Sequence, residues 1–91
     1  MKIEYFFRDG EKLEEHFLEH GEQTNSASAE EYLIKANRVI NNPKALKKYE
    51  TDEYDNDMVY YFSETGEIVF VSAEGYIRTY FVADDEYFER Q

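Results

Sequence analysis

Apolar residues recur at helical spacing in the first half of this chain and at strand spacing in the second half. Over residues 11–19 they fall on one side of a helical wheel, and Gly21 follows where a helix would end. Ser28 and Glu31 form a capping-box pattern ahead of a second run with helical spacing, which Pro43 brings to an end. The first half therefore predicts two helices joined by a short polar loop.

The second half predicts three consecutive antiparallel strands. Three segments are rich in β-branched and aromatic residues, and the short glycine-containing turns ETG and AEG separate them: MVYYFS (58–63), EIVFVS (67–72) and YIRTYFV (76–82). The aromatic segment IEYFF (3–7) predicts an N-terminal strand, PKALKKY (43–49) a short third helical turn, and DDEYFERQ (84–91) a last turn or a frayed end. The fold class expected is α+β, with the N-terminal strand and two to three helices packed on one face of a C-terminal antiparallel β-meander.

Length and composition predict one folded domain over residues 1–91. The chain is 42% hydrophobic and 18% aromatic, which is too apolar for a disordered polypeptide. It has no cysteine, so disulfides and thiolate zinc sites are excluded and a cytoplasmic protein is expected. No apolar run is long enough for a signal peptide or a membrane span, and no membrane association is expected.

The net charge of −11 argues against binding of nucleic acid by charge alone. Half of the ten basic residues nevertheless lie in residues 35–48, a stretch without any acidic residue. Four of them are candidates for binding the phosphates of a polyanion: Lys35, Arg38, Lys47 and Lys48. The alternative is a solvated helix face whose positive charges offset acidic neighbours.

Both histidines, His16 and His20, lie four residues apart in the first predicted helix, in the stretch EEHFLEHGE. Residues at this spacing share one face of a helix, and the wheel directs His20 toward the sheet and leaves His16 at the rim. Three interpretations follow: a metal-binding pair, an acid–base pair, or two packing residues. A zinc site needs at least one further ligand, which the surrounding glutamates do not single out, so no metal or other cofactor is expected. Histidine titrates close to neutral pH, as a general acid or base must.

The last predicted strand carries a second group of candidates. Strict alternation puts Tyr76, Arg78 and Tyr80 on one face and leaves Thr79 on the other. An arginine between two tyrosines is suited to binding a phosphate, although a surface arginine stacked on tyrosine has the same pattern. Which face of the strand meets the helices remains open at this point.

Two blocks in this order, HFLEHGEQTNSASAEEYLIKANRVI and ETGEIVFVSAEGYIRTYF, resemble the small nucleases of the barnase–EndoU–colicin–RelE superfamily. The likeness is to the branch found in phage proteins and in bacterial polymorphic toxins, and it spans about residues 14–82. The resemblance implies a metal-independent ribonuclease in which the ribose 2′-hydroxyl attacks the adjacent phosphate. By position, His16 and His20 would be the general acid and base, Arg78 would stabilise the charge on the phosphorane, and Thr79 and Tyr80 would position the phosphate. Tyr76, next to Arg78 on the predicted strand face, is a candidate for contacting the substrate.

Two hypotheses therefore remain. The first is a phage-type or toxin-type ribonuclease, with RNA as substrate and a cognate inhibitor as a further partner. The second is a non-enzymatic acidic protein on the same scaffold, which engages a basic partner or mimics nucleic acid. The order of the two blocks favours the first, and the charge favours the second. A monomer and a homodimer are both compatible with the sequence.

Overall fold

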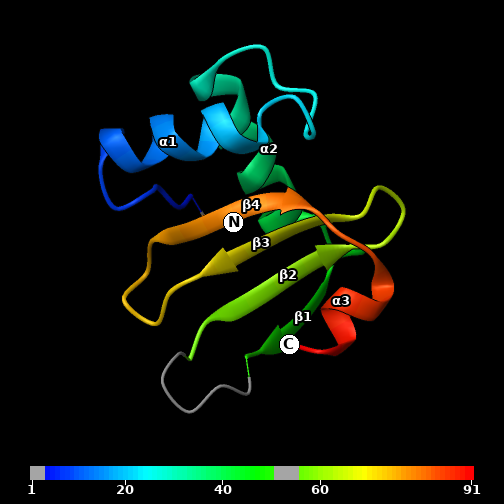
Figure 1. Ribbon diagram of the computed structural model, residues 1–91. Helices are drawn as coiled ribbons and strands as arrows, with labels where there is room; N and C mark the ends of the chain where they lie inside the picture. Colours follow the sequence, from blue (N-terminus) through cyan, green and yellow to red (C-terminus); the bar gives the residue numbers. More distant parts are fainter. Residues whose placement is uncertain (1–3, 51–55) are drawn as a thin grey trace.

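The computed structural model describes residues 4–50 and 56–91, which form an α+β fold (Figure 1). Its elements, in chain order, are α1 (Gly10–His20), α2 (Ala29–Asn41), β1 (Leu46–Tyr49), β2 (Met58–Phe62), β3 (Glu67–Val71), β4 (Ile77–Val82) and α3 (Asp85–Glu89). The expected fold class is confirmed. Within the described ranges, no helix has both the length and the apolar character that crossing a membrane requires.

The sheet has four antiparallel strands in the order β1-β2-β3-β4. The meander of β2, β3 and β4 is confirmed, but the helical turn predicted over residues 43–49 is wrong, because most of this segment is strand β1. Lys47 lies opposite Tyr60 and Lys48 opposite Val59 in the ladder with β2. Pairing with a neighbouring strand decides the structure of this segment and overrides its local helix propensity.

Each of the two long helices begins at a side chain that caps it. Asp9 accepts a hydrogen bond from the backbone N–H of Lys12 at 2.8 Å, and α1 starts there. Ser28 accepts from the N–H of Glu31 at 3.1 Å, while the Glu31 carboxylate accepts from the N–H of Ala27. These contacts satisfy N–H groups that a helix start leaves without partners, and they confirm the predicted start of α2.

Each face of the sheet carries its own core. The helix-side core lies between the sheet and α1 and α2, and its buried members are Phe7, Tyr32, Ala36, Val39, Ile40, Tyr60, Val69, Val71, Ile77 and Tyr80. The α3-side core covers the other face, where Phe88 stacks on Tyr61 with ring centroids 4.9 Å apart. The tail therefore forms a helix rather than a frayed end, and it packs on the sheet face opposite to α2 (Figure 1).

The N-terminal segment contributes one isolated bridge within the described residues, and Ile3 of the strand predicted over residues 3–7 lies outside them. Phe7 pairs in parallel with Ile77, and the N–H of Ile77 donates to the carbonyl of Phe6 at 2.8 Å. This bridge fixes the start of β4 to the segment that leads into α1. It thereby helps to hold α1 alongside β4, where the histidines lie.

Candidate functional site

The two histidines lie side by side on the surface of α1 that packs along β4. Their ring centroids are 6.1 Å apart, as expected for residues one helical turn apart. Leu13 and Phe17, on the same helix, pack against the helix-side core and so fix the rotation of α1. The spacing predicted from the sequence therefore brings both imidazoles to one place, called here the histidine pair.

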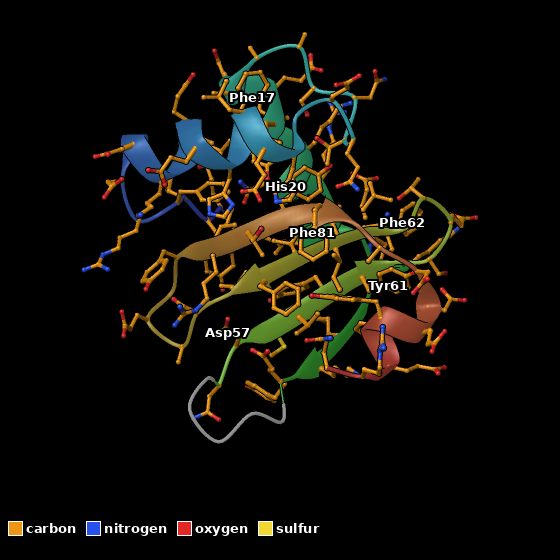
Figure 2. The ribbon with its side chains drawn as sticks, in the orientation of Figure 1. Phe17, His20, Asp57, Tyr61, Phe62 and Phe81 are labelled. Atoms are coloured by element: carbon orange, nitrogen blue, oxygen red, sulfur yellow. The ribbon has the colours of Figure 1, made fainter. Side chains whose placement is uncertain are left out.

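Each imidazole packs against an aromatic ring. His16 lies 5.3 Å from the ring centroid of Phe7, and His20 lies 5.4 Å from that of Phe81 on β4 (Figure 2). Both histidines are half-buried. Burial lowers the pKa of His16, and the nearby His20 charge lowers it further. Neutral imidazole is therefore favoured at His16.

One nitrogen of the histidine pair lacks a hydrogen bond. His16 Nδ1 is buried and has no partner among the residues that the structure describes. Buried polar atoms are nearly always hydrogen-bonded in folded proteins, so this nitrogen is an exception that calls for an explanation. The His20 Nε2 atom lies 3.8 Å from a carboxylate oxygen of Glu19, whose side chain is 69% exposed.

Arg78 lies in a β-bulge and is bound to a carboxylate. Ile77 pairs with Val71 and Thr79 with Phe70, which leaves Arg78 as the extra residue of β4. Its Nε donates to the Asp57 carboxylate at 2.9 Å, and its guanidinium lies 5.7 Å from the ring centroid of Tyr76. Figure 2 places Asp57 near the start of β2, well apart from His20. The structure thus joins Arg78 to Tyr76 and Asp57.

The bulge also changes the direction of the residues that follow. Ile77 and Tyr80 both enter the helix-side core, so the predicted common face for Tyr76, Arg78 and Tyr80 is wrong. Tyr80 is fully buried, and its hydroxyl donates to the Glu67 carboxylate. Burial raises the pKa of Tyr80, and the hydrogen bond to Glu67 raises it further. Thr79 is half-buried on the opposite face, so Thr79 and Tyr80 do not converge on one phosphate position.

The basic candidates separate into two groups. Lys35 and Arg38 line a cleft of about 480 Å³ bounded by the α1–α2 loop, α2, the β2–β3 turn and the end of β4. Lys47 and Lys48 lie on β1, where Lys48 sits 4.5 Å from the ring centroid of Phe88. The continuous basic strip suggested by the sequence is therefore not formed.

Within the cleft, the two cations differ. Lys35 donates to the backbone carbonyls of Thr24 and Asn25, at 3.2 and 2.6 Å, and holds the α1–α2 loop. Arg38 is exposed and makes no hydrogen bond or ion pair with the described residues, although its charge lowers the pKa of Tyr80. Of the basic candidates in the cleft, Arg38 is the better placed to bind a ligand.

The cleft begins next to the histidine pair. The Thr24 hydroxyl lies in the cleft wall and donates to the carbonyl of His20 at 3.0 Å. Gln23 accepts from the N–H of Val82, the residue after Phe81, and both Gln23 and Val82 line the cleft. Residues adjacent to His20 and to Phe81 thus line the same cleft as Arg38.

Three acidic residues contact the candidate residues in the structure but are not candidates from the sequence: Glu19, Asp57 and Glu67. No local pattern distinguishes Glu19 from the other glutamates of α1. The partners of Asp57 and Glu67 are distant in the chain, and they are decided by the strand register. Neither the known protein-family models nor the curated proteins give a match to this chain.

Proposed function

We propose that this chain is a metal-independent endoribonuclease of phage or toxin type, with the histidine pair as its proton donor and acceptor. The observation that carries the proposal is the pair itself: two half-buried imidazoles, with nitrogens within 4.8 Å of each other, on one surface beside β4. RNA cleavage of this type needs a base for the attacking oxygen and an acid for the leaving oxygen of one phosphorus atom, and two neighbouring imidazoles can supply both.

In the proposed reaction, one imidazole takes the proton of the ribose 2′-hydroxyl, and that oxygen bonds to the adjacent phosphorus. The bond from phosphorus to the 5′-oxygen breaks, and the other imidazolium donates its proton to that oxygen. The products are a 2′,3′-cyclic phosphate and a 5′-hydroxyl, and no oxidant or metal is consumed. Positioned acids and bases of this kind typically contribute about 10²–10⁴-fold each.

For the substrate phosphate, the cleft beside the histidine pair supports Arg38 as the contact. Arg38 is an exposed cation without a hydrogen bond or ion pair in the described part of the chain, and a guanidinium matches phosphate oxygens. Arg78 is better explained as a structural residue, because its Nε is bound to Asp57 at 2.9 Å. This assignment moves the expected phosphate contact from β4 to α2.

A second candidate function is a non-enzymatic protein that binds a basic partner. The net charge of −11 favours it, because a negatively charged protein repels RNA and attracts a cationic surface over a long range. Large apolar side chains are also exposed, including Leu18 and Tyr49. The two candidates differ in whether RNA is cleaved, which can be measured directly.

The test is incubation of the purified protein with total RNA and with tRNA, in the presence of EDTA, followed by analysis of the product ends. Wild type should produce 2′,3′-cyclic phosphates, and His16→Ala and His20→Ala should each lower the rate by roughly a hundredfold or more. Leu18→Ala is the matched control, because Leu18 lies on the same helix and is largely exposed. Its rate should equal that of wild type.

Intact RNA under every condition would refute the nuclease and leave the binding protein as the remaining candidate. Cleavage that EDTA abolishes would refute the metal-independent mechanism. Equal activity in His16→Ala and wild type would show that the histidine pair is not the acid–base pair.

A further inference from the structure

A third potential ligand lies beside the two imidazoles on α1. His16, Glu19 and His20 each offer one nitrogen or oxygen atom, and these three atoms lie within 4.8 Å of one another. From this cluster we propose that the three residues bind a divalent transition-metal ion of the Zn²⁺ type, and that the bound ion inhibits RNA cleavage. The inhibition rests on the proposed nuclease function, whereas the binding does not.

Helix geometry explains why these three residues converge. Residues three and four positions apart are neighbours on a helix surface, so positions 16, 19 and 20 lie around one point. The two imidazoles are held by packing on Phe7 and Phe81, at 5.3 and 5.4 Å between ring centroids. Glu19 is 69% exposed, so its carboxylate is free to adjust to an ion that the imidazoles position.

The structure also contains an atom that lacks a partner at this place. His16 Nδ1 is buried and forms no hydrogen bond with the described residues. This orphan nitrogen belongs to the same imidazole that offers a ligand atom to the cluster. It is an observation independent of the acidic composition of α1, and an ion bound at Nδ1 would give this atom the partner that it lacks.

The ligand types select the class of metal. Two imidazole nitrogens and one carboxylate oxygen suit Zn²⁺ and its neighbours Ni²⁺ and Cu²⁺, whereas Mg²⁺ and Ca²⁺ prefer sites made wholly of oxygen. Three protein ligands leave a fourth position for water or for a substrate atom. The protein's net charge of −11 raises the local concentration of cations. The sequence predicts no metal because no glutamate stands out, and the structure singles out Glu19.

A metal ion at this position would prevent the proposed reaction. An imidazole nitrogen that donates its electron pair to a metal cannot accept a proton from a 2′-hydroxyl, nor can it carry one to the leaving oxygen. Occupancy of the site would therefore remove the base and the acid together, and removal of the ion would restore both.

Zinc binding is measured first, by isothermal titration calorimetry of the full chain with ZnCl₂. Wild type should bind one ion. Glu19→Gln should bind it roughly tenfold more weakly, and each histidine-to-alanine variant roughly a hundredfold more weakly, because loss of even an outer-shell partner lowers metal affinity by about tenfold or more. Glu14→Gln is the matched control, because Glu14 is exposed on the same helix at a position outside the cluster, and it should bind as wild type does. Circular dichroism confirms that each variant is folded.

Absence of saturable binding by folded wild type would overturn the site. Equal weakening in Glu14→Gln and Glu19→Gln would also overturn it, because it would show adsorption to the acidic surface. Cleavage of RNA by wild type should fall as zinc saturates the site and return when EDTA is added. Half-inhibition of Glu19→Gln should need roughly tenfold more zinc.

The two proposals fail in different ways. If the chain binds zinc as described but cleaves no RNA with EDTA present, the nuclease is refuted and the metal site stands. If it cleaves RNA at an unchanged rate when saturated with zinc, the inhibitory role is refuted. If it cleaves RNA and binds no zinc, only the metal site is lost.

Discussion

The ion pair between Arg78 and Asp57 provides a direct test of whether Arg78 serves the fold or the chemistry. Arg78 Nε lies 2.9 Å from both carboxylate oxygens of Asp57. The Asp57 side chain is 4% exposed and the Arg78 side chain 41% exposed. A buried carboxylate depends on its hydrogen bonds, so Arg78→Ala should destabilise the fold even though arginine itself is near the surface.

The size of the effect follows from this burial. A hydrogen bond to a charged group contributes about 1.5–3 kcal/mol, and the partial exposure of Arg78 places the cost of Arg78→Ala near the lower end, at about 2 kcal/mol. Asp57→Asn keeps an acceptor of similar shape and removes the charge, so it should cost less. The double variant contains neither charge, so no charged group is left without its partner, and the two single costs should together exceed the double cost by about 1 kcal/mol or more.

The assay is equilibrium unfolding in urea at neutral pH, followed by circular dichroism and by tyrosine fluorescence, since the chain has no tryptophan. A coupling energy near zero would refute the structural role of the pair. RNA cleavage by the same variants completes the test: the double variant, measured where it is folded, should keep activity within a few-fold of wild type. A loss as large as that of His20→Ala, without loss of stability, would return Arg78 to the catalytic role that the family resemblance implies.

Two further predictions address the other parts of the structure. Burial raises the pKa of Tyr61 to about 12, with a contribution from its hydrogen bond to Asp85. The unfolded chain ionises this tyrosine near pH 10, whereas the folded chain keeps it neutral, so the stability that Tyr61 contributes is complete below about pH 10 and is lost as the pH rises toward 12. In urea unfolding, Tyr61→Phe should therefore show a weaker fall in stability over that range. A fall equal to that of wild type would contradict the raised pKa of Tyr61. Arg38→Ala should raise the KM for RNA by roughly tenfold with little change in kcat, since it removes a phosphate contact. Arg90→Ala, just after the end of α3, should leave both unchanged. A KM equal to that of wild type would exclude Arg38 as the contact.

Local patterns predict those elements whose signals are local. The start of α2 follows from Ser28 with Glu31, which act on backbone groups within a few residues. The three strands of the meander follow from their composition and from their short turns. The same reasoning puts both histidines on one helix face, and the structure confirms that placement.

Features that depend on distant pairing could not be obtained in this way. Strand β1 forms because residues 46–49 find a partner in β2, although the segment itself has helix-forming lysines and leucine. The bulge at Arg78 depends on the register with β3, and it reverses the predicted direction of Tyr80. The contact between Arg78 and Asp57 joins residues 21 positions apart in the chain. A common face for Tyr76, Arg78 and Tyr80 requires a regular strand, which the chain does not form.

The distribution of charge around the histidine pair bears on both proposals. On the α1 side, the Glu15 and Glu19 charges raise the pKa of His16, against the larger effect of burial, and they favour a cation at the pair. On the cleft side, Arg38 favours an anion. An RNA phosphate and a metal ion would thus approach the same imidazoles from differently charged surroundings. The net charge of the chain is a poor guide to either ligand, because these opposite local charges lie on the two sides of one pair of residues.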